Sequence, residues 1–309
     1  MKHSIAYLLT MIGASFWGLT GLFVETLYSY GFTAWEIVTI RLLSSSMILL
    51  AILALFSRSY LKIEWKHIPH FIGLGVFGIV LFNWFYFKVM EQTSISIAVV
   101  LLYTSPVFVA ILSKIIFKEK FTIQKLLSIV LTIVGCSFAV QLIPLGDFHM
   151  SFHSMLLGIL SAFFCALYSV IGKMVSAHYN FITITVYSLF MGSLFIAPTS
   201  SLWKKAEHFQ SSEVWLSIIG ISIISTICAY TLYTFGLTYI ESSKAAILGV
   251  LEPIVAILVG VFIYSDSLRL LQIIGIILVL FSAFITVFQK RRKVKKRMHG
   301  YYAYKSRGE

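Results

Sequence analysis

Ten apolar segments, most of them more than 20 residues long, account for most of this chain and leave only short connections. A helix needs about 20 apolar residues to cross roughly 30 Å of hydrocarbon, so each segment is long enough to span a membrane. Lipid offers the backbone no hydrogen bonds, so the spans must be α-helices, and barrel strands are excluded because they are about half as long. The expected spans are residues 4–26, 33–56, 67–88, 94–117, 124–143, 153–176, 181–202, 214–237, 242–264 and 270–289.

Composition supports the membrane interpretation. Apolar residues make up 59% of the 309 positions, charged residues only 12%, and the mean hydropathy is +0.93. Soluble domains carry about 25% charged residues, so this chain needs lipid as part of its solvent. The net charge of +12 does not indicate a nucleic-acid partner, because nine of the 24 Lys and Arg residues follow Gln289 in a C-terminal tail. Such a cluster is typical of a cytoplasmic end that contacts anionic membrane lipid.

The positions of lysine and arginine predict the orientation. With the N-terminus in the cytoplasm, the cytoplasmic connections hold, besides the tail, Arg58, Lys62, Lys66, Lys118, Lys120, Lys125 and Lys244. The other side holds only Lys88, Lys204, Lys205 and Arg269. Cytoplasmic loops of membrane proteins carry an excess of such residues. Both termini are therefore expected in the cytoplasm.

The chain repeats itself at an offset of 147 residues, the distance from Pro106 to Pro253. At this offset residues of the same kind coincide elsewhere: Gly73 with Gly220, Tyr86 with Tyr233, Ser96 with Ser243, and Glu119 with Asp266. Each copy contains five expected spans. Because five is odd, the second copy must be inverted relative to the first.

The connections agree with an inverted repeat. Lys118-Glu119-Lys120 follows the fourth span, whereas its counterpart after the ninth span, Ser265-Asp266-Ser267, carries no lysine. Inverted repeats are frequent in secondary transporters, whose sites lie near the midplane between the copies. The sequence therefore predicts an all-α integral membrane protein with ten transmembrane helices in two inverted-topology five-helix repeats. It also favours secondary transport of a small-molecule substrate by alternating access.

Several motifs add a family resemblance. They are Leu101 to Pro106 with Phe117 to Lys120, Leu251 to Pro253 with Tyr264 to Leu268, the early Ala14-Ser-x-Trp17-Gly18, and Arg41-Leu42. Through them the chain resembles the drug/metabolite transporter superfamily, specifically its EamA-type ten-helix transporters. The resemblance implies a first EamA-type repeat over residues 4–143 and a second over 153–289, and the charge distribution adds a basic cytoplasmic tail over residues 290–309. It further implies ion-driven export of metabolites or drugs across a bacterial cytoplasmic membrane.

Pro106 and Pro253 lie near the middle of spans four and nine. A mid-helix proline lacks an N–H group and frees the carbonyl four residues earlier. Paired interruptions at corresponding positions of two repeats indicate a binding site in transporters. A kink that serves packing alone explains the two prolines equally well.

Two charged residues inside spans are candidates for function. Glu252 is the acidic residue nearest a span centre, where a carboxylate is costly and must face the bundle interior, so it is a candidate for proton coupling or coupling to another ion. The alternative is a neutral carboxyl group that caps kinked backbone. Arg41 in span two suits a carboxylate-bearing substrate through bidentate hydrogen bonds. It suits a structural role between helices at least as well.

Polar and aromatic residues within the spans suggest a mixed cavity for planar or amphipathic solutes. The candidate substrate-binding residues, besides Arg41, are Trp17, Asn83, Tyr86, Tyr103, Tyr168, Tyr230 and Tyr233. Aromatic residues near span ends more often form interfacial belts. That alternative fits these positions less well, because several lie in mid-span.

Motifs for other kinds of function are missing from the sequence. His149 and His153 have a spacing that suits a metal but no third ligand nearby, so no metal site is expected. No Walker-type loop is present, and no cofactor or catalytic residue is expected. An intramembrane enzyme or a lipid-handling protein is the alternative function, although the histidines form no cluster. The sequence leaves a homodimer open.

Overall fold

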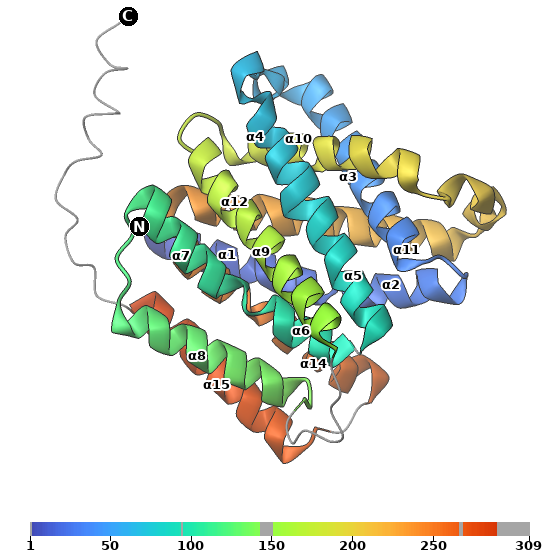
Figure 1. The fold of residues 1–309 in the computed structure, drawn as a ribbon. Helices are drawn as coiled ribbons and strands as arrows, with labels where there is room; N and C mark the ends of the chain where they lie inside the picture. Colours follow the sequence, from blue (N-terminus) through green and yellow to red (C-terminus); the bar gives the residue numbers. More distant parts are fainter. Residues whose placement is uncertain (1, 94, 143–150, 266–267, 289–309) are drawn as a thin grey trace, which may run out of the picture.

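The computed structural model describes residues 2–93, 95–142, 151–265 and 268–288, and all regular elements in these ranges are helices (Figure 1). Nine helical segments are long and apolar enough to cross a membrane, and a shorter apolar helix, Ile123–Ala139, stands at the fifth expected span. At 1.5 Å per residue its 17 residues extend about 26 Å. The predicted all-helical membrane fold is therefore confirmed. The expected tail, residues 290–309, lies outside the described residues.

The helices follow the order of the expected spans. Spans one to five are α1 (Lys2–Gly18) with α2 (Thr20–Ser29); α3 (Ala34–Phe56); α4 (Ile68–Ile72) with η3 (Gly73–Leu81) and α5 (Phe82–Gln92); α6 (Ile95–Leu102) with α7 (Ser105–Phe117); and α8 (Ile123–Ala139). Spans six to ten are α9 (Phe152–Val175); α10 (Phe181–Ile196); α11 (Ser212–Ser222) with η6 (Ile223–Cys228) and α12 (Ala229–Tyr239); α13 (Ser242–Leu248) with α14 (Leu251–Tyr264); and α15 (Leu270–Phe288). Short 3-10 turns in the connections are η1 (Arg58–Leu61), η2 (Trp65–His67), η4 (Ala197–Thr199) and η5 (Leu202–Gln210).

Spans four and nine are each broken immediately before a proline. α6 ends at Leu102 and α7 begins at Ser105, while α13 ends at Leu248 and α14 begins at Leu251. Each proline thus lies in the first turn of the second piece, where its missing N–H group has no intrahelical partner to lose. At the repeat offset the two breaks lie within one residue of each other.

Spans three and eight share a different irregularity. Both contain a π-helical stretch, Gly73–Leu81 and Ile223–Cys228, and the two stretches end at repeat-equivalent residues. Wide turns of this kind occur frequently at functional sites. Hydropathy is averaged over about 19 residues, so it detects neither the breaks nor these stretches.

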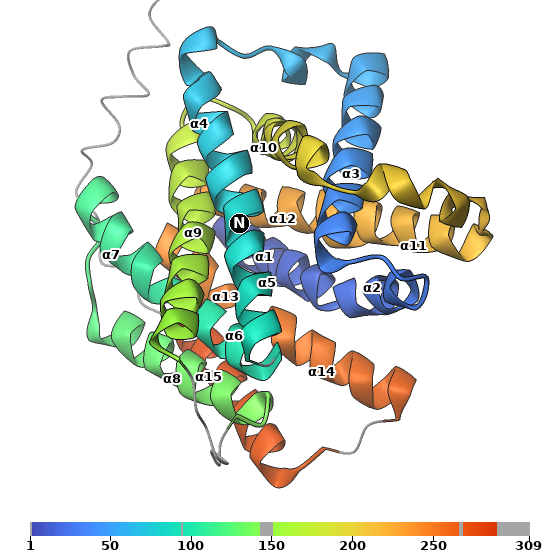
Figure 2. The ribbon, with the colours of Figure 1, turned by 45° about the vertical axis from the view of Figure 1, so that its right-hand side comes forward.

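The main contacts between helices are symmetric: exchanging the roles of the two halves turns each of these pairs either into itself or into another pair. α8 lies along α15 in a layer of its own, as Figures 1 and 2 both show, and α3 packs against α10. α1 packs against α12, and the reciprocal pair is formed by α5 and η3 against α9. This pattern is the one expected for two copies related by a pseudo-twofold axis.

Small residues set the contact between α8 and α15. A Cβ atom on Gly275 would collide with backbone atoms of Gly135 and of Ala139, one turn further along α8. One further contact joins the same helices, because the Ser282 hydroxyl donates to the Ser128 carbonyl at 2.8 Å. Positions 128 and 275 are repeat-equivalent, and so are positions 135 and 282. The two contacts are therefore copies of each other, although one uses glycines and the other serines.

Candidate transport cavity

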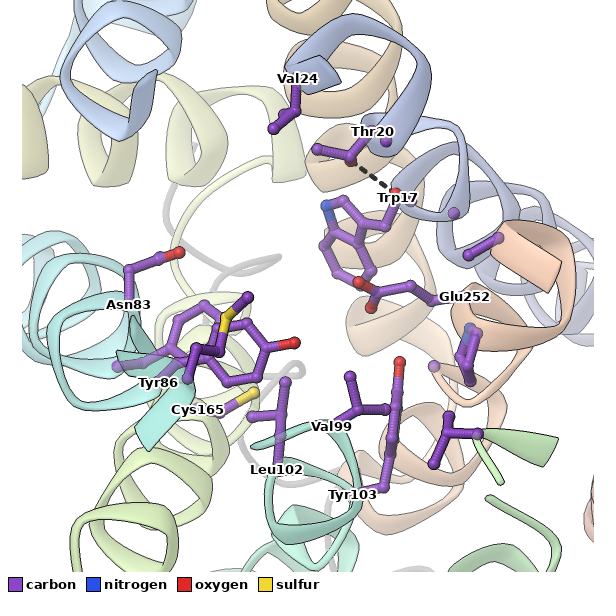
Figure 3. A pocket seen from close by; sticks show the side chains of 18 of the residues that line it. Trp17, Thr20, Val24, Asn83, Tyr86, Val99, Leu102, Tyr103, Cys165 and Glu252 are labelled. Atoms are coloured by element: carbon purple, nitrogen blue, oxygen red, sulfur yellow. Dashed lines mark hydrogen bonds between the residues drawn. The ribbon is translucent and has the colours of Figure 1, made fainter. Parts of the chain in front are cut away.

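A cavity of about 870 Å³ lies between the two halves (Figure 3). Its walls come from α1, α2, α3, η3, α5, α6 and α7 of the first half and from α9, α11, α12, α13, α14 and α15 of the second. Small-molecule sites are commonly of roughly 300–1,000 Å³, with mostly apolar walls and a few polar groups. The cavity has room for a metabolite or a drug-sized solute.

The cavity extends toward one face of the membrane domain. We call the side that holds the N-terminus the N-terminal face, and the other side the opposite face. The lining reaches Tyr28 at the end of span one, Gln141 at the end of span five and Arg269 before span ten, all at the opposite face. Toward the N-terminal face, the described lining ends at Ser169 of α9 and Ala246 of α13. Beyond them, Val170, Leu237 and Ala245 are buried, so packed side chains close that end.

Four aromatic side chains form one wall of the cavity. The Trp17 ring lies 5.1 Å from the Tyr230 ring and 5.0 Å from the Tyr233 ring, measured between centroids. The Tyr168 ring lies 5.1 Å from the Tyr230 ring in an edge-to-face arrangement. Such edge-to-face pairs attract one another and hold rings in fixed positions. The wall therefore offers a rigid aromatic surface to a planar solute.

Two tyrosines of this wall also join helices. The Tyr168 hydroxyl is hydrogen-bonded to the Thr234 hydroxyl at 2.8 Å, and the Tyr233 hydroxyl to the Ser169 hydroxyl at 2.8 Å. Both bonds connect α9 to α12. Their hydroxyl groups are therefore already engaged, so these two residues present mainly ring surface to the cavity.

The facing wall carries Asn83, Tyr86 and Tyr103, and Figure 3 shows the three pointing into the open space. The Asn83 amide donates to the Ile79 carbonyl of the preceding π-helical stretch at 2.7 Å. This bond fixes the amide and leaves its oxygen available as an acceptor. Asn83 and Tyr103 are 5% and 7% exposed, so both are almost fully enclosed by protein.

The acidic and basic side chains among the described lining residues are Arg41, Arg269 and Glu252. Figure 3 shows the Tyr103 hydroxyl pointing toward the Glu252 carboxylate, and Arg41 lines the same cavity. Figure 3 shows Glu252 beside Trp17. A carboxylate, a guanidinium and an indole thus share one aromatic cavity.

Two buried donors in the cavity lack partners. Among the described residues, neither the Trp17 indole nitrogen nor the Arg41 Nε has a hydrogen-bond partner. A buried donor that stays unpaired costs about 1–3 kcal/mol. Both residues line the cavity, so a solute that brings an acceptor group there would satisfy them.

The break in span nine positions Glu252. The residue lies in the first turn of α14, and its backbone N–H donates to the Gly249 carbonyl at 3.1 Å. α1 approaches closely at Gly18, where an added Cβ would collide with the Glu252 backbone carbonyl. The break and this close contact together turn the carboxylate toward the cavity.

All eight candidate substrate-binding residues and Glu252 line this one cavity. Pro253 lines it as well, whereas Pro106 is buried outside the lining. The lining also includes polar residues that sequence reasoning missed: Thr20, Tyr28, Ser105, Gln141, Cys165, Ser169, Arg269 and Gln272. Ser105 could have been found from the sequence, since it is the repeat partner of Glu252. The others are residues that hydrocarbon tolerates or that stand at span ends.

No group of three or more His, Cys, Asp or Glu side chains that could hold a metal is found in the described part of the chain. His149, one of the two histidines considered for metal binding, lies outside that part. Three cysteines, Cys136, Cys165 and Cys228, are free thiols.

Comparison with known proteins decides the family. Residues 4–141 and 153–288 both match the EamA-like transporter family. The chain belongs to this family. It is therefore a multi-pass membrane transporter with a duplicated domain, and the family resemblance drawn from its motifs is confirmed. Membership in a transporter family also decides against the enzyme alternative.

The relatives resemble this transporter over nearly its whole length. An uncharacterized transporter of Archaeoglobus fulgidus is 27% identical over 93% of this chain and 99% of its own. The uncharacterized transporter YxxF of Bacillus subtilis is 24% identical over 97% and 94%, respectively. The uncharacterized inner membrane transporter YicL of Salmonella typhimurium is 23% identical over 92% and 96%. A solved crystal structure with 16% identity covers 94% of this chain and 99% of its own with a TM-score of 0.78, which shows the same fold.

Proposed function

We propose that this transporter exports small metabolites that carry a carboxylate, such as amino acids and related compounds, or amphipathic drugs, by ion-coupled alternating access. The observation that carries the proposal is the cavity between the inverted halves, which combines the Glu252 carboxylate, the Arg41 guanidinium with its buried Nε, and an aromatic wall. Its position between two repeats is where secondary transporters bind their substrates.

Arg41 and Trp17 support a substrate with an acceptor group. Their unpartnered nitrogens are donors that a carboxylate oxygen would complete. A guanidinium binds a carboxylate through two parallel hydrogen bonds, which is stronger and more directional than a neutral contact. The aromatic wall of Trp17 and Tyr230 then receives the apolar part of the solute.

Glu252 supports coupling to a proton. Its carboxylate faces the cavity from the middle of a broken span, and the Tyr103 hydroxyl points toward it from the facing wall. Carboxyl groups inside membrane spans frequently mark proton or substrate pathways. In the proposed cycle, the carboxylate takes up a proton from one face and releases it toward the other as the two packings exchange.

Flux through reconstituted vesicles tests the function. Purified protein in liposomes with an imposed pH gradient is assayed for efflux of labelled amino acids, other carboxylates and cationic or neutral amphipathic drugs. We expect gradient-dependent flux of at least one carboxylate-bearing solute above that of empty vesicles. Flux of none of the panel under either gradient direction would overturn the proposal.

The Glu252→Gln variant tests the coupling separately. It keeps the size of the side chain and removes the exchangeable charge, so gradient-driven accumulation should fall at least about tenfold while exchange of substrate without a gradient continues. Glu91→Gln is the matched control, because Glu91 carries an exposed carboxylate, 62% exposed, that is paired with Lys88. If Glu252→Gln keeps full pH-driven transport, Glu252 has a structural role.

A further inference from the structure

A charged cluster, in which Lys125 and Glu119 are buried and Glu241 is 43% exposed, joins the two halves at the N-terminal face. Lys125, at the start of α8, lies 3.1 Å from the Glu119 carboxylate in the connection before it and 2.6 Å from the Glu241 carboxylate before α13. The Lys125 and Glu119 side chains are 4% and 9% exposed. Removing one member of a buried pair is strongly unfavourable, because it leaves the other charge uncompensated. Lys125 is thus a strong tie between spans five and nine.

Glu119 also holds the start of α13. One carboxylate oxygen accepts the backbone N–H of Ser242 at 3.0 Å, and the other accepts the Ser243 hydroxyl. The first N–H groups of a helix have no partner within it, so an external acceptor fixes where the helix begins. Glu119 thereby attaches the connection between spans four and five to the first residues of span nine.

These contacts lie beyond the closed end of the cavity. α13 starts at Ser242, its residue Ala246 is the first one to line the cavity, and Glu252 follows in α14. The element that the ion pair holds at the N-terminal face is therefore the same span that carries Glu252 into the cavity. Any opening toward this face that moves α13 away from α8 must break the contacts of Lys125 and Glu119.

The second half has no equivalent cation. Gln272 stands at the position that corresponds to Lys125 at the repeat offset. Its side chain accepts from the Arg269 backbone N–H at 2.9 Å and donates to the Ala139 carbonyl at 3.4 Å. These are neutral hydrogen bonds, and a glutamine cannot form an ion pair. At this pair of repeat-equivalent positions, the N-terminal face thus has an ion pair where the opposite face has neutral hydrogen bonds.

We propose that Glu119, Lys125 and Glu241 form a charged latch that closes the N-terminal face. Because position 272 has no charge to match it, the latch favours the conformation whose cavity extends toward the opposite face. This inference goes beyond the proposed function: it concerns which face is closed at rest, and it needs neither a particular substrate nor a coupling ion.

Accessibility of Cys165 tests the latch. This native cysteine lines the cavity, so it serves as the reporter once Cys136 and Cys228 are replaced by alanine. A membrane-impermeant maleimide is applied to each face in turn, in right-side-out and inverted vesicles whose sidedness is read from an N-terminal tag. The measured quantity is the ratio of the labelling rate from the N-terminal face to that from the opposite face.

In Lys125→Gln, which installs the residue of the second half, we expect this ratio to rise at least about fivefold, with a smaller rise in Glu119→Gln. Lys125→Arg retains the charge and should keep the ratio close to that of the parent protein. Lys66→Gln is the matched control, because it removes a lysine from an exposed pair with Glu64 at the same face, with side chains 69% and 64% exposed. Its ratio should not change.

A loss of folding is distinguished by a second reporter. Cys136 is fully buried between helices, so a variant that keeps only this cysteine is labelled quickly only when the bundle opens altogether. If Lys125→Gln and Glu119→Gln stay folded by this criterion and keep the parent ratio, the latch does not exist. If the ratio changes equally in Lys66→Gln, the effect is one of surface charge, and the proposal also fails.

Discussion

The two halves of this transporter agree closely in backbone and differ in chemistry. Spans two and seven both begin after a residue whose side chain caps the helix, Thr33 and its repeat partner Asn180. α7 and α14 both end in a left-handed residue, Lys118 with φ of 56° and its partner Ser265 with φ of 59°. Such local features are set by a few neighbouring residues, so they survive when much of the rest of the two copies diverges.

The charged groups Glu252 and Arg41 of the cavity are not duplicated, although its tyrosines Tyr86 and Tyr233 are repeat partners. The repeat partner of Glu252 is Ser105, and that of Arg41 is Ser188. Symmetric backbones are useful in a transporter, because each arrangement of the two halves has an alternative of similar energy in which the halves exchange roles. A second charge of each kind would place like charges in one small cavity, which is unfavourable. The comparison thus separates a duplicated scaffold from a site that is built once.

The largest expected effect follows from this asymmetry. Arg41→Met should weaken transport of carboxylate-bearing solutes about 10- to 100-fold, the value of a charge-assisted hydrogen bond, and leave uncharged amphipathic solutes within about twofold. Ser188→Ala, at the repeat-equivalent position, should stay within about twofold for both classes. Concentration-dependent flux in vesicles measures both.

Equal losses for charged and uncharged solutes in Arg41→Met would show that the guanidinium supports the helices and does not select the substrate. A large effect in Ser188→Ala would contradict the single-site interpretation. Methionine is compatible with a membrane span, so the variant is expected to insert normally.

Much of this architecture follows from the sequence, for an identifiable physical reason. Transfer of a long apolar run into lipid is favourable whatever its neighbours are, so hydropathy locates spans such as α3 and α15 within a residue or two. Charges inside spans are costly, so Glu252 and Arg41 stand out without any structure. The repeat offset then adds that spans four and nine correspond.

Other features of the site depend on three-dimensional contacts and leave no signal in the sequence. Ser169 and Cys165 line the cavity, but hydrocarbon tolerates both residue types, so nothing in their sequence context distinguishes them. The latch depends on Lys125 meeting Glu241, which lies 116 positions further along the chain (125 to 241). The extent of the cavity toward one face depends on the packing of all ten spans and is not a property of any single one.

The second prediction concerns the scaffold, where the halves agree. Gly275→Ala should lower the stability of the folded bundle by about 1–3 kcal/mol, because the added methyl group collides with the backbone of α8 at Gly135 and Ala139. Gly21→Ala is the control, since nothing lies within 4 Å of a Cβ there. It should be neutral or stabilising by up to about 1 kcal/mol, the difference in helix propensity. Thermal unfolding in detergent measures both.

A further variant, Ser282→Ala, probes the repeat-equivalent contact. It removes the hydrogen bonds of the Ser282 hydroxyl to the Ser128 carbonyl and to the Thr132 hydroxyl and should cost about 1–2 kcal/mol. If Ser282→Ala destabilises the protein more than Gly275→Ala, close approach of the two backbones is not what holds this pair of helices together.

The smallest expected effect separates the two prolines. Each lies in the first turn of its helix, so replacement by alanine should change stability by less than about 1 kcal/mol in either half.

The effect on transport should differ between the two prolines, because alanine permits the broken span to straighten. Pro253 lines the cavity next to Glu252, so Pro253→Ala should reorient the carboxylate and reduce gradient-driven flux severalfold. Pro106 is buried outside the cavity lining, and Pro106→Ala should reduce flux less. Both variants are compared by flux per folded protein and by unfolding temperature, measured on the same samples. If Pro106→Ala loses as much flux as Pro253→Ala or more, both breaks act as a symmetric hinge. The halves then share more of the mechanism than their side chains indicate.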